Sequence, residues 1–349
     1  QDPRSQFFAN EVAGEIAFGC ENYGYSHEDI QSHVHRAAAD IKIQDILDYS
    51  LHSLSYGMRQ KVAIASAEAI DPEIYVMDEP SANLDIASTY RFADIIRDLK
   101  QQGKTIIIAE HRLYYLMDLA DRFLCVQKGK IVREFTAQQM KALSNEEIRV
   151  LGLRTPDLHQ IEQAEIPSAA TSEVVLEVKK LNHSFGETIV AKDIDFQCCK
   201  GEVVALIGPN GTGKSTIGRI LAGLLKEKSG EVVLFGKHCR PKGRLGKVWY
   251  IPQDLDSQLF GEDLLDELTT GAEVNPERKQ AAEEILEALE LTPFIKQHPS
   301  TLSGGQKQRL ALGVALMHEA SIIVLDEPTS GLDGTNMRNV SRMIRKLAK

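Results

Sequence analysis

The chain has 349 residues, with 40 lysines and arginines against 50 aspartates and glutamates, so its formal net charge is −10 and its pI is near 5.6. This length allows two domains with separate cores, and the acidity argues against nucleic acid as the main partner. The five scattered cysteines favour reduced thiols over a disulfide framework or zinc site, and no apolar run approaches the roughly 18–20 residues of a membrane span.

One residue pattern occurs twice in the chain. The matched blocks, in chain order, are Gln1–Phe8 with Gln253–Phe260 at an offset of 252, then Leu54–Gly57 with Leu302–Gly305 and Ile74–Asp85 with Ile322–Asp333, both at an offset of 248. Three blocks in the same order are unlikely to match by coincidence. The repeat therefore predicts two copies of one domain.

The two copies are cut differently. The first begins at the Gln1 block and continues through a predicted helix over Ile86–Gln102, ended by Gly103, and a predicted strand over Thr105–Ala109. The second has an earlier section that the first lacks, and it stops at Lys349, before the counterpart of His111. We therefore expect a fragment of a longer protein, truncated at both ends.

A segment rich in proline and small polar residues separates the copies. It contains Pro156 and Pro167 and predicts a linker over residues 152–173. The predicted domains are then residues 1–151, the C-terminal part of the first copy, and residues 174–349, a second copy that lacks its C-terminal end. Val174–Val178 predicts the opening strand of the second domain.

A glycine-rich loop follows in the second domain. Gly208–Thr216 fits the pattern G-x-x-x-x-G-K-[ST], between an apolar run, Val203–Ile207, that predicts a buried strand and a helical pattern over Ile217–Leu225. Its glycines let successive backbone amides surround an anion at a helix N-terminus. We expect Lys214 to reach the β- and γ-phosphates of a nucleotide and the Ser215 hydroxyl to bind Mg²⁺.

Two helix starts come later in the chain. Asn275 and Pro276 form a typical N-cap and first turn. Ser303–Gln306 opens a predicted helix over Lys307–Met317, where a serine and exposed amides can hold an anion. In isolation the second start is equally well explained as an ordinary N-cap.

Two carboxylates follow a predicted parallel strand. The apolar run Ile322–Leu325 would deliver Asp326 and Glu327 to the edge of the sheet where α/β proteins bind ligands. Asp326 suits Mg²⁺, and Glu327 suits the activation of a water molecule. Asp78 and Glu79 are the equivalents in the first copy. An exposed strand end would explain an isolated pair of this kind.

Three further side chains are candidates for contacts with a nucleotide or its metal ion because of their positions relative to these motifs. Gln253 could contact Mg²⁺ or the attacking water, as could its counterpart Gln1. Phe185, 23 residues before Gly208, could stack on adenine, although a half-buried strand aromatic is the alternative. His111 ends a strand and could bond the γ-phosphate.

Together these blocks resemble the nucleotide-binding domains of ATP-binding cassette (ABC) proteins. The motifs are GPNGTGKST at 208–216, Gln253, LSGGQ at 302–306, IIVLDEP at 322–328, SGLD at 330–333 and a switch histidine at His111. The tandem arrangement and QDPRSQFF at 1–8 resemble the fused ATPase subunit of energy-coupling factor (ECF) transporters, which import vitamins and metal ions. The resemblance implies an α/β fold with two P-loop NTPase domains of ABC type in tandem, each with a mainly parallel sheet core and a helical lobe.

The resemblance also implies residue roles, with ATP as substrate and Mg²⁺ as cofactor. The catalytic residues would be Glu327, Glu79 and His111. The metal residues would be Ser215, Gln253, Asp326, Gln1 and Asp78. The ATP-binding residues would be Phe185, Gly208, Asn210, Gly211, Gly213, Lys214, Ser215, Thr216, Gln253, Ser55, Gly57, Asp85, Ser303, Gly304, Gly305, Gln306 and Asp333.

In such proteins the domains pair head to tail, and each ATP lies between the phosphate loop of one domain and the signature of the other. The loop at 208–216 would then face Ser55, Gly57 and Asp85. The first signature departs from the family pattern, because Tyr56 replaces a glycine and Met58 replaces the glutamine. The opposite site would use Gln1, Asp78, Glu79 and His111 against Ser303–Gln306, but its phosphate loop is absent from this chain. Since both glutamates are present, we expect two hydrolysis-competent sites in the intact protein.

The resemblance implies a multi-span membrane subunit, with a separate substrate-binding membrane subunit as a further partner, at the cytoplasmic face of the membrane. Apolar side chains beside the glutamine blocks are candidates for the contact with it, unless they are buried in their own domains: Phe7, Phe8, Leu259 and Phe260. The main alternative is a soluble tandem ABC ATPase acting on ribosomes or DNA, against which the short, non-basic linker and the net acidity argue. A degenerate, structural pair is a third hypothesis, which the intact Lys214, Asp326 and Glu327 oppose.

Overall fold

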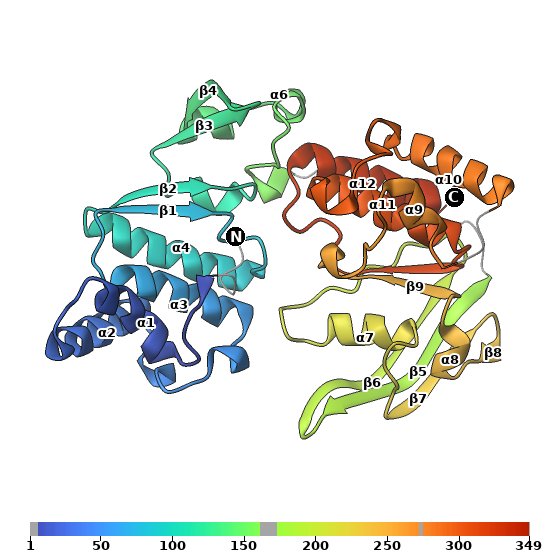
Figure 1. The fold of residues 1–349 in the computed structure, drawn as a ribbon, viewed down its shortest axis with the longest axis horizontal. Coiled ribbons are helices and arrows are strands. Elements are labelled where there is room, and N and C mark those ends of the chain that lie inside the picture. Colours follow the sequence, from blue (N-terminus) through green and yellow to red (C-terminus); the bar gives the residue numbers. More distant parts are fainter. Residues whose placement is uncertain (1–5, 161–172, 272–274, 349) are drawn as a thin grey trace. The chain divides into compact units, whose positions relative to one another are not determined.

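A computed structural model describes residues 6–160, 173–271 and 275–348 (Figure 1). The chain divides into two compact units, Gln1–Ile161 and Glu162–Lys349, called unit 1 and unit 2 below. The division falls inside the segment 152–173 that the sequence predicts as a linker. The exact domain bounds stay a prediction, because residues 161–172 lie outside the described ranges.

Unit 1 is built around one apolar core. Its helices are α1 (Val12–Asn22), α2 (His27–Ile41), α3 (Tyr56–Glu68), α4 (Ile86–Gln101), α5 (Ala137–Lys141) and α6 (Asn145–Val150). Its strands are β1 (Ile74–Asp78), β2 (Thr105–Ala109), β3 (Arg122–Gln127) and β4 (Lys130–Thr136). β1 and β2 pair in parallel, with α4 connecting them, and β3 and β4 form an antiparallel hairpin. The carboxyl ends of β1 and β2 therefore lie at the same edge.

Unit 2 has two cores, one under an antiparallel sheet and one in a helical lobe. Its helices are α7 (Lys214–Leu221), α8 (Pro241–Arg244), α9 (Leu264–Thr269), α10 (Pro276–Ala288), α11 (Gly304–Met317) and α12 (Gly334–Leu347). Its strands are β5 (Val174–Phe185), β6 (Thr188–Cys199), β7 (Ser229–Leu234), β8 (Lys237–His238), β9 (Val248–Ile251) and β10 (Ile322–Leu325). The antiparallel sheet has the order β6-β5-β7-β8, and β9 pairs with β10 in parallel.

The two units repeat one architecture. The counterparts are α1 and α9, α2 and α10, α3 and α11, β1 and β10, and α4 and α12. Three pairs of non-glycine residues with positive φ also recur at the offset of 248: Lys42 and Glu290 (59° and 56°), Asp71 and Glu319 (50° and 51°), and Glu79 and Glu327 (42° and 47°). Residues other than glycine rarely adopt a positive φ. Its recurrence at matched positions therefore supports the internal repeat independently of the motifs.

Local sequence explains most of the helix starts. Asn275 caps α10, since its side chain accepts a hydrogen bond of 2.7 Å from the amide of Arg278, and Pro276 follows at the first helical position. Asp85 caps α4 in the same way through the amide of Ser88, at 2.7 Å. The predicted starts of these helices are therefore confirmed, and α4 ends at Gln101, one residue before the predicted end.

The strand predicted over Val203–Ile207 is wrong for this structure. These residues form no strand, and Ile207 is 89% exposed. An apolar segment becomes a buried strand only when neighbouring strands supply hydrogen-bond partners and cover its side chains. Among the described residues of unit 2, the parallel strands β9 and β10 pair with each other, and neither pairs with this segment.

Candidate functional site

The glycine-rich loop of unit 2 leads directly into α7, as its pattern predicts. Gly213 is the N-cap of this helix and has φ of 88°, a left-handed conformation that favours glycine. A Cβ atom at this position would lie 2.3 Å from the carbonyl oxygen of Val190. The close approach of β6 to the loop therefore requires glycine here.

The lysine of the loop is held by the loop itself. Lys214 Nζ donates hydrogen bonds to the carbonyl oxygens of Gly208, at 2.8 Å, and Pro209, at 2.7 Å. Thr212 Oγ1 donates to the same Pro209 carbonyl at 2.9 Å. Loop residues Gly208, Asn210 and Gly211 are exposed, as is Ser215, and Thr216 is half-buried in the first turn of α7. The structure thus brings the predicted phosphate-loop residues together in one accessible turn.

Helix α7 packs closely on the parallel strands through a second glycine. A Cβ at Gly218 would lie 3.1 Å from both Tyr250 on β9 and Val324 on β10. This approach places α7 beside β9 and β10, which end just before Gln253 and Asp326 respectively. The Tyr250 hydroxyl donates a hydrogen bond of 2.7 Å to Asp326 Oδ2. Burial, followed by the Asp326 carboxylate, raises the pKa of Tyr250 to about 12.

Both predicted catalytic glutamates follow their strands in a strained backbone conformation. Glu79 has φ of 42° and Glu327 has φ of 47°. Such conformations cost roughly 1–3 kcal/mol for a non-glycine residue and occur preferentially at functional sites. The strain turns each glutamate sharply out of its strand, directly after Asp78 or Asp326.

In unit 1, the glutamate lies next to the predicted histidine. His111 Nε2 is 3.4 Å from Glu79 Oε1, with the two side chains 39% and 19% exposed. The Glu79 amide also donates to the Ala109 carbonyl at 2.8 Å, which joins the ends of β1 and β2. Asp78, Glu79 and His111 therefore gather at one sheet edge, as the strand pattern predicts.

The signature residues begin matching helices but are capped differently. Ser303 begins α11, and its amide donates to Gln306 Oε1 at 2.8 Å. Ser55 begins α3, and its hydroxyl accepts from the amide of Met58 at 3.3 Å. Since a methionine side chain cannot accept in the manner of Gln306, the first signature lacks this second cap.

The remaining signature residues have structural surroundings of their own. A Cβ at Gly305 would lie 2.5 Å from Asn336 of α12, whereas Gly57 and Gly304 have only ordinary contacts. Asp333 caps α12 through the amide of Asn336, at 2.6 Å, as Asp85 caps α4. A helix cap is therefore one role of both aspartates, and their contact with ATP stays a prediction.

Three other predicted residues are placed individually. Gln253 is exposed, and its Nε2 lies 3.5 Å from Ser330 Oγ, in the loop after Glu327. Phe185 ends β5 and is 55% exposed, with its ring in edge contact with His183. This exposure agrees with an available aromatic face rather than a half-buried one. Gln1 lies outside the described residues.

The apolar residues beside the glutamine blocks are only partly exposed. Phe8 and Phe260 are 73% and 76% exposed, but Leu259 is buried and Phe7 packs against the core of unit 1. The expectation that all four are exposed is therefore wrong for Phe7 and Leu259. Alternate side chains of the segment turn inward, where they stabilise their own unit.

Sequence reasoning missed two buried carboxylates that hold these exposed phenylalanines. Glu15 accepts hydrogen bonds from the amides of Phe8 and Ala9, at 2.8 and 2.9 Å. Glu267, at the same offset of 252, accepts from the amides of Phe260 and Gly261, at 2.7 and 2.6 Å. Both side chains are nearly fully buried. Extending the aligned glutamine blocks by seven residues would have revealed the matched glutamates.

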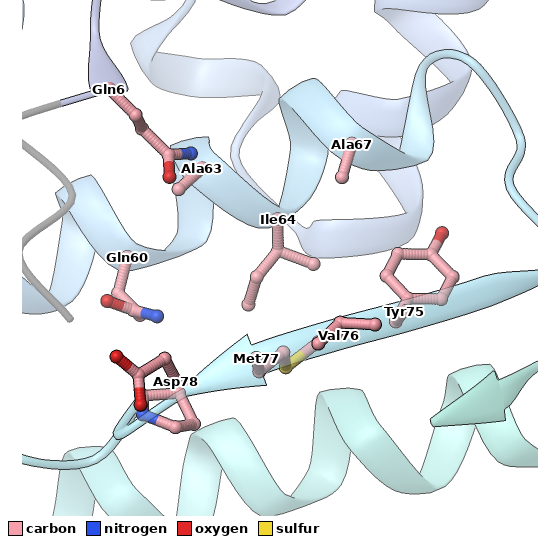
Figure 2. A pocket seen from close by; sticks show the side chains of 10 residues that line it. Gln6, Gln60, Ala63, Ile64, Ala67, Tyr75, Val76, Met77 and Asp78 are labelled. Atoms are coloured by element: carbon pink, nitrogen blue, oxygen red, sulfur yellow. The ribbon is translucent and has the colours of Figure 1, made fainter. Parts of the chain in front are cut away.

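A cavity of about 170 Å³ lies between α3 and β1 of unit 1 (Figure 2). Gln6, Gln60 and Asp78 line one end of it, and Tyr75 lines the other. The volume is below the roughly 300–1,000 Å³ of ordinary small-molecule pockets. We therefore assign no nucleotide to this cavity.

The described residues contain neither a membrane span nor a self-sufficient metal cluster. Among them, no helix is both long and apolar enough to cross a membrane. Within the same ranges, no group of three or more histidine, cysteine, aspartate or glutamate side chains could hold a metal ion by itself.

Comparison with known proteins gives consistent matches over the chain. A family model described as "ABC transporter" matches residues 1–82 and 191–330. An ABC transporter ATP-binding protein of Treponema denticola is 38% identical over 348 residues, which cover 99% of this chain and 71% of that protein. The HMP/thiamine import ATP-binding protein YkoD of Bacillus subtilis is 30% identical over 374 residues, which cover 99% of this chain and 68% of that protein.

One solved structure extends the similarity to the tandem fold. A chain from the structure of ribosome-bound archaeal Pelota and ABCE1 aligns with a TM-score of 0.68 and 25% identity. The alignment covers 99% of this chain and 56% of that chain. Both units of the chain are thus included in one match.

Proposed function

The chain belongs to the ABC transporter family of ATP-binding proteins, and we propose that it powers an ECF-type transporter that imports a vitamin or a metal ion. Membership of this family and the tandem P-loop NTPase fold were both predicted from the motifs and are confirmed. The import assignment is supported by the B. subtilis relative, whose name states HMP/thiamine import. The observation that carries ATP hydrolysis is the matched, strained conformation of Glu79 and Glu327 after their aspartates.

In this proposal, ATP enters the loop at 208–216. The γ- and β-phosphates take the place of the Gly208 and Pro209 carbonyls as partners of the Lys214 ammonium. The N-terminus of α7 adds backbone donors and a favourable dipole. Phe185, exposed at the end of β5, offers its ring to the adenine.

Residues at the start of α7 and after β9 and β10 fit a magnesium site. The hydroxyl of Ser215 and the carboxylate of Asp326 supply the oxygen donors that Mg²⁺ prefers, and Gln253 adds an amide oxygen. When bound, Mg²⁺ would neutralise charge on the β- and γ-phosphates. Tyr250 holds Oδ2 of Asp326 and so orients this carboxylate.

The glutamates supply the base. Glu327 orients a water molecule and takes a proton from it as the water oxygen bonds to the γ-phosphorus. The bond from the γ-phosphorus to the oxygen that bridges to the β-phosphate breaks, and ADP leaves with that oxygen. In unit 1, His111 lies within 3.4 Å of Glu79 and would donate to the γ-phosphate beside it. Positioned donors and a positioned base are the main contributions that a protein makes to phosphoryl transfer.

We further propose that the units pair head to tail around ATP. One site would combine the loop at 208–216 with Ser55, Gly57 and Asp85 of unit 1. The other would use Gln1, Asp78, Glu79 and His111 with the signature at 303–306 and Asp333 of unit 2, together with a phosphate loop that the printed sequence does not contain. ATP would then draw the two units together, and hydrolysis would release them.

The proposed partner is a multi-span membrane subunit, which places the protein peripherally at the cytoplasmic face of the membrane. The exposed rings of Phe8 and Phe260, each on a loop held by a buried glutamate, support a contact with apolar side chains of that partner. The likeness to a chain of the ribosome-bound assembly favours, as the second candidate, a soluble ATPase that acts on ribosomes. Co-purification with a membrane protein or with ribosomes distinguishes the two.

ATP turnover by Lys214→Ala and Glu327→Gln tests the hydrolytic function. We expect Lys214→Ala to lose ATP binding and Glu327→Gln to keep binding but lose most turnover. Lys237→Ala, on the exposed strand β8, serves as a control that leaves both unchanged. Full turnover in Glu327→Gln would show that Glu327 is not the base.

A further inference from the structure

In unit 1, residues 109–112 make several contacts with the loop at 79–85. Ala109 is the last residue of β2 and residues 110–112 follow it, whereas the loop at 79–85 connects β1 to α4. The Glu79 amide donates to Ala109, and the Glu79 carboxylate lies beside His111. The two flanking residues, Glu110 and Arg112, hold the rest of the loop.

Glu110 uses both of its carboxylate oxygens. Oε1 accepts from the amides of His111 and Arg112, at 2.8 and 3.0 Å. Oε2 accepts from the Ser81 hydroxyl at 2.7 Å, the Ser81 amide at 3.3 Å and the Tyr115 hydroxyl at 2.9 Å. One carboxylate therefore joins the backbone that carries His111 to the loop that follows Glu79.

Arg112 fastens the same loop further along. Its Nη1 donates to the Leu84 carbonyl at 2.6 Å, and its Nη2 donates to the Ala82 carbonyl at 2.9 Å. Leu84 directly precedes Asp85, the cap of α4. Two donors in a fixed planar fork define the loop position better than a single point contact would.

The hydrogen bonds of Glu110 to Ser81 and Tyr115 are largely shielded from solvent. Ser81 is fully buried, and Tyr115 is nearly so, which makes the network costly to break. Burial and then the Glu110 carboxylate raise the pKa of Tyr115. Unit 1 also has a buried tyrosine–glutamate pair outside the loop, Tyr75 on β1 with Glu68 on α3, which serves as a structural comparison.

We propose that Glu110 and Arg112 are positioning residues that make the loop at 79–85 and the segment at 109–112 one rigid piece. This inference rests on the proposed ATPase function. Glu110 keeps His111 aligned with Glu79, and Arg112 keeps Asp85 in a fixed relation to both. Any displacement of His111 is thereby transmitted to Asp85.

Hydrogen exchange in variants of Glu110 and Arg112 tests whether these residues hold the loop at 79–85 rigid. In the full chain, Glu110→Ala and Arg112→Met should each increase the exchange rate of the amides of Ala82 and Leu84. An increase on the order of tenfold or more corresponds to losing a hydrogen bond to a charged group. Glu110→Gln should give an intermediate rate, because its amide group can still bond to His111 and to the two hydroxyls.

Kinetics of ATP turnover test the positioning role. Both substitutions should lower kcat on the order of tenfold with an unchanged KM for ATP, since they alter alignment rather than nucleotide binding. The control Tyr75→Phe should lower thermal stability but leave kcat and the exchange of the loop unchanged. Glu110→Gln should recover part of kcat.

The outcomes separate this inference from the proposed function. Unchanged exchange at Ala82 and Leu84 would overturn the rigid piece, and faster exchange with normal kcat would overturn the positioning role. Absence of turnover in the unsubstituted protein would instead count against the proposed ATPase function, while the exchange rates would still decide whether the piece is rigid.

Discussion

The Tyr250 hydroxyl donates a hydrogen bond of 2.7 Å to Oδ2 of Asp326, joining two adjacent parallel strands at the candidate metal site. Tyr250 is only 9% exposed. In unit 1, the matched Asp78 lines the polar end of a cavity together with Gln6 and Gln60.

Tyr250→Phe should lower the affinity of the candidate site for Mg²⁺. Removing the hydroxyl leaves the Asp326 carboxylate without its orienting donor, and losses of this kind cost about 10–100-fold in metal affinity or activity. We expect a higher Mg²⁺ concentration for half-maximal ATP turnover, with the KM for ATP little changed. A Mg²⁺ titration identical to that of the unsubstituted protein would contradict the orienting role.

The same tyrosine predicts a loss of stability in alkaline solution. Its pKa is raised from 10.0 to about 12 in the folded chain, so the neutral phenol favours folding. This contribution is fully present below pH 10 and is lost as the pH rises towards about 12. The free energy of unfolding should therefore fall less steeply over that interval for Tyr250→Phe. Equal slopes for the two proteins would show that Tyr250 does not contribute.

Gly213→Ala should abolish nucleotide binding. Its Cβ would meet the Val190 carbonyl oxygen at 2.3 Å, and its φ of 88° adds backbone strain of roughly 1–3 kcal/mol. Gly211→Ala is a matched control, since Gly211 has φ of 81° but no neighbouring atom within 4 Å of the added Cβ. Equilibrium binding of an ATP analogue should distinguish them. Equal affinities would mean that the contact with β6 is unimportant.

Local patterns in the sequence were sufficient for several features of the fold. The repeat correctly identified β1 and β10 as counterparts, and Asn275 correctly marked the start of α10. Both features depend on residues that are close together in the sequence. The strand predicted over Val203–Ile207 depended on distant strands, which periodicity cannot supply. A pattern of apolar residues indicates what a segment can become, while its partners decide what it becomes.

The candidate site shows the same limit. The positions of Glu79 and Glu327 followed from the motif, but their positive φ did not. The contact of Glu110 with Ser81 joins residues 29 positions apart, and that of Tyr250 with Asp326 joins residues 76 positions apart. Neither partner carries a local signal, so both contacts required the folded backbone.

Phe260→Asp should reduce binding of the proposed membrane subunit without affecting the fold. The ring is 76% exposed, so its loss removes little buried area. Phe8→Asp should add to the effect, since Phe8 holds the matched position in unit 1. Co-purification with the membrane subunit should fall while nucleotide binding is retained. Unchanged co-purification in the double variant would exclude both rings from the contact.

Glu267→Ala should act on the same loop through stability. It leaves the amides of Phe260 and Gly261 without their acceptor, at a cost of about 1–3 kcal/mol for an unsatisfied buried donor. Glu267→Gln keeps an acceptor oxygen and is the matched control. Chemical denaturation measures the difference. If the two variants were equally stable, the hydrogen bonds would not stabilise the loop.

Glu227→Gln should be more destabilising than loss of the whole ion pair. Arg244 is fully buried and donates to Glu227 at 2.5 Å, and its Nε and Nη1 have no hydrogen-bond partner among the described residues. Removing the counter-charge alone leaves a buried guanidinium uncompensated, which costs about 3–5 kcal/mol. Asp118→Asn, which breaks the exposed pair with Lys141, should cost at most about 1 kcal/mol.

The double variant Glu227→Leu with Arg244→Met tests whether the uncompensated charge of Arg244 or the packing of its side chain causes the destabilisation. It removes both charges and fills the space with apolar side chains, and such replacements are often neutral or stabilising. We therefore expect its free energy of unfolding to exceed that of Glu227→Gln. If the double variant were the less stable of the two, the packing of the Arg244 side chain, rather than its compensated charge, would be the dominant contribution to stability at this position.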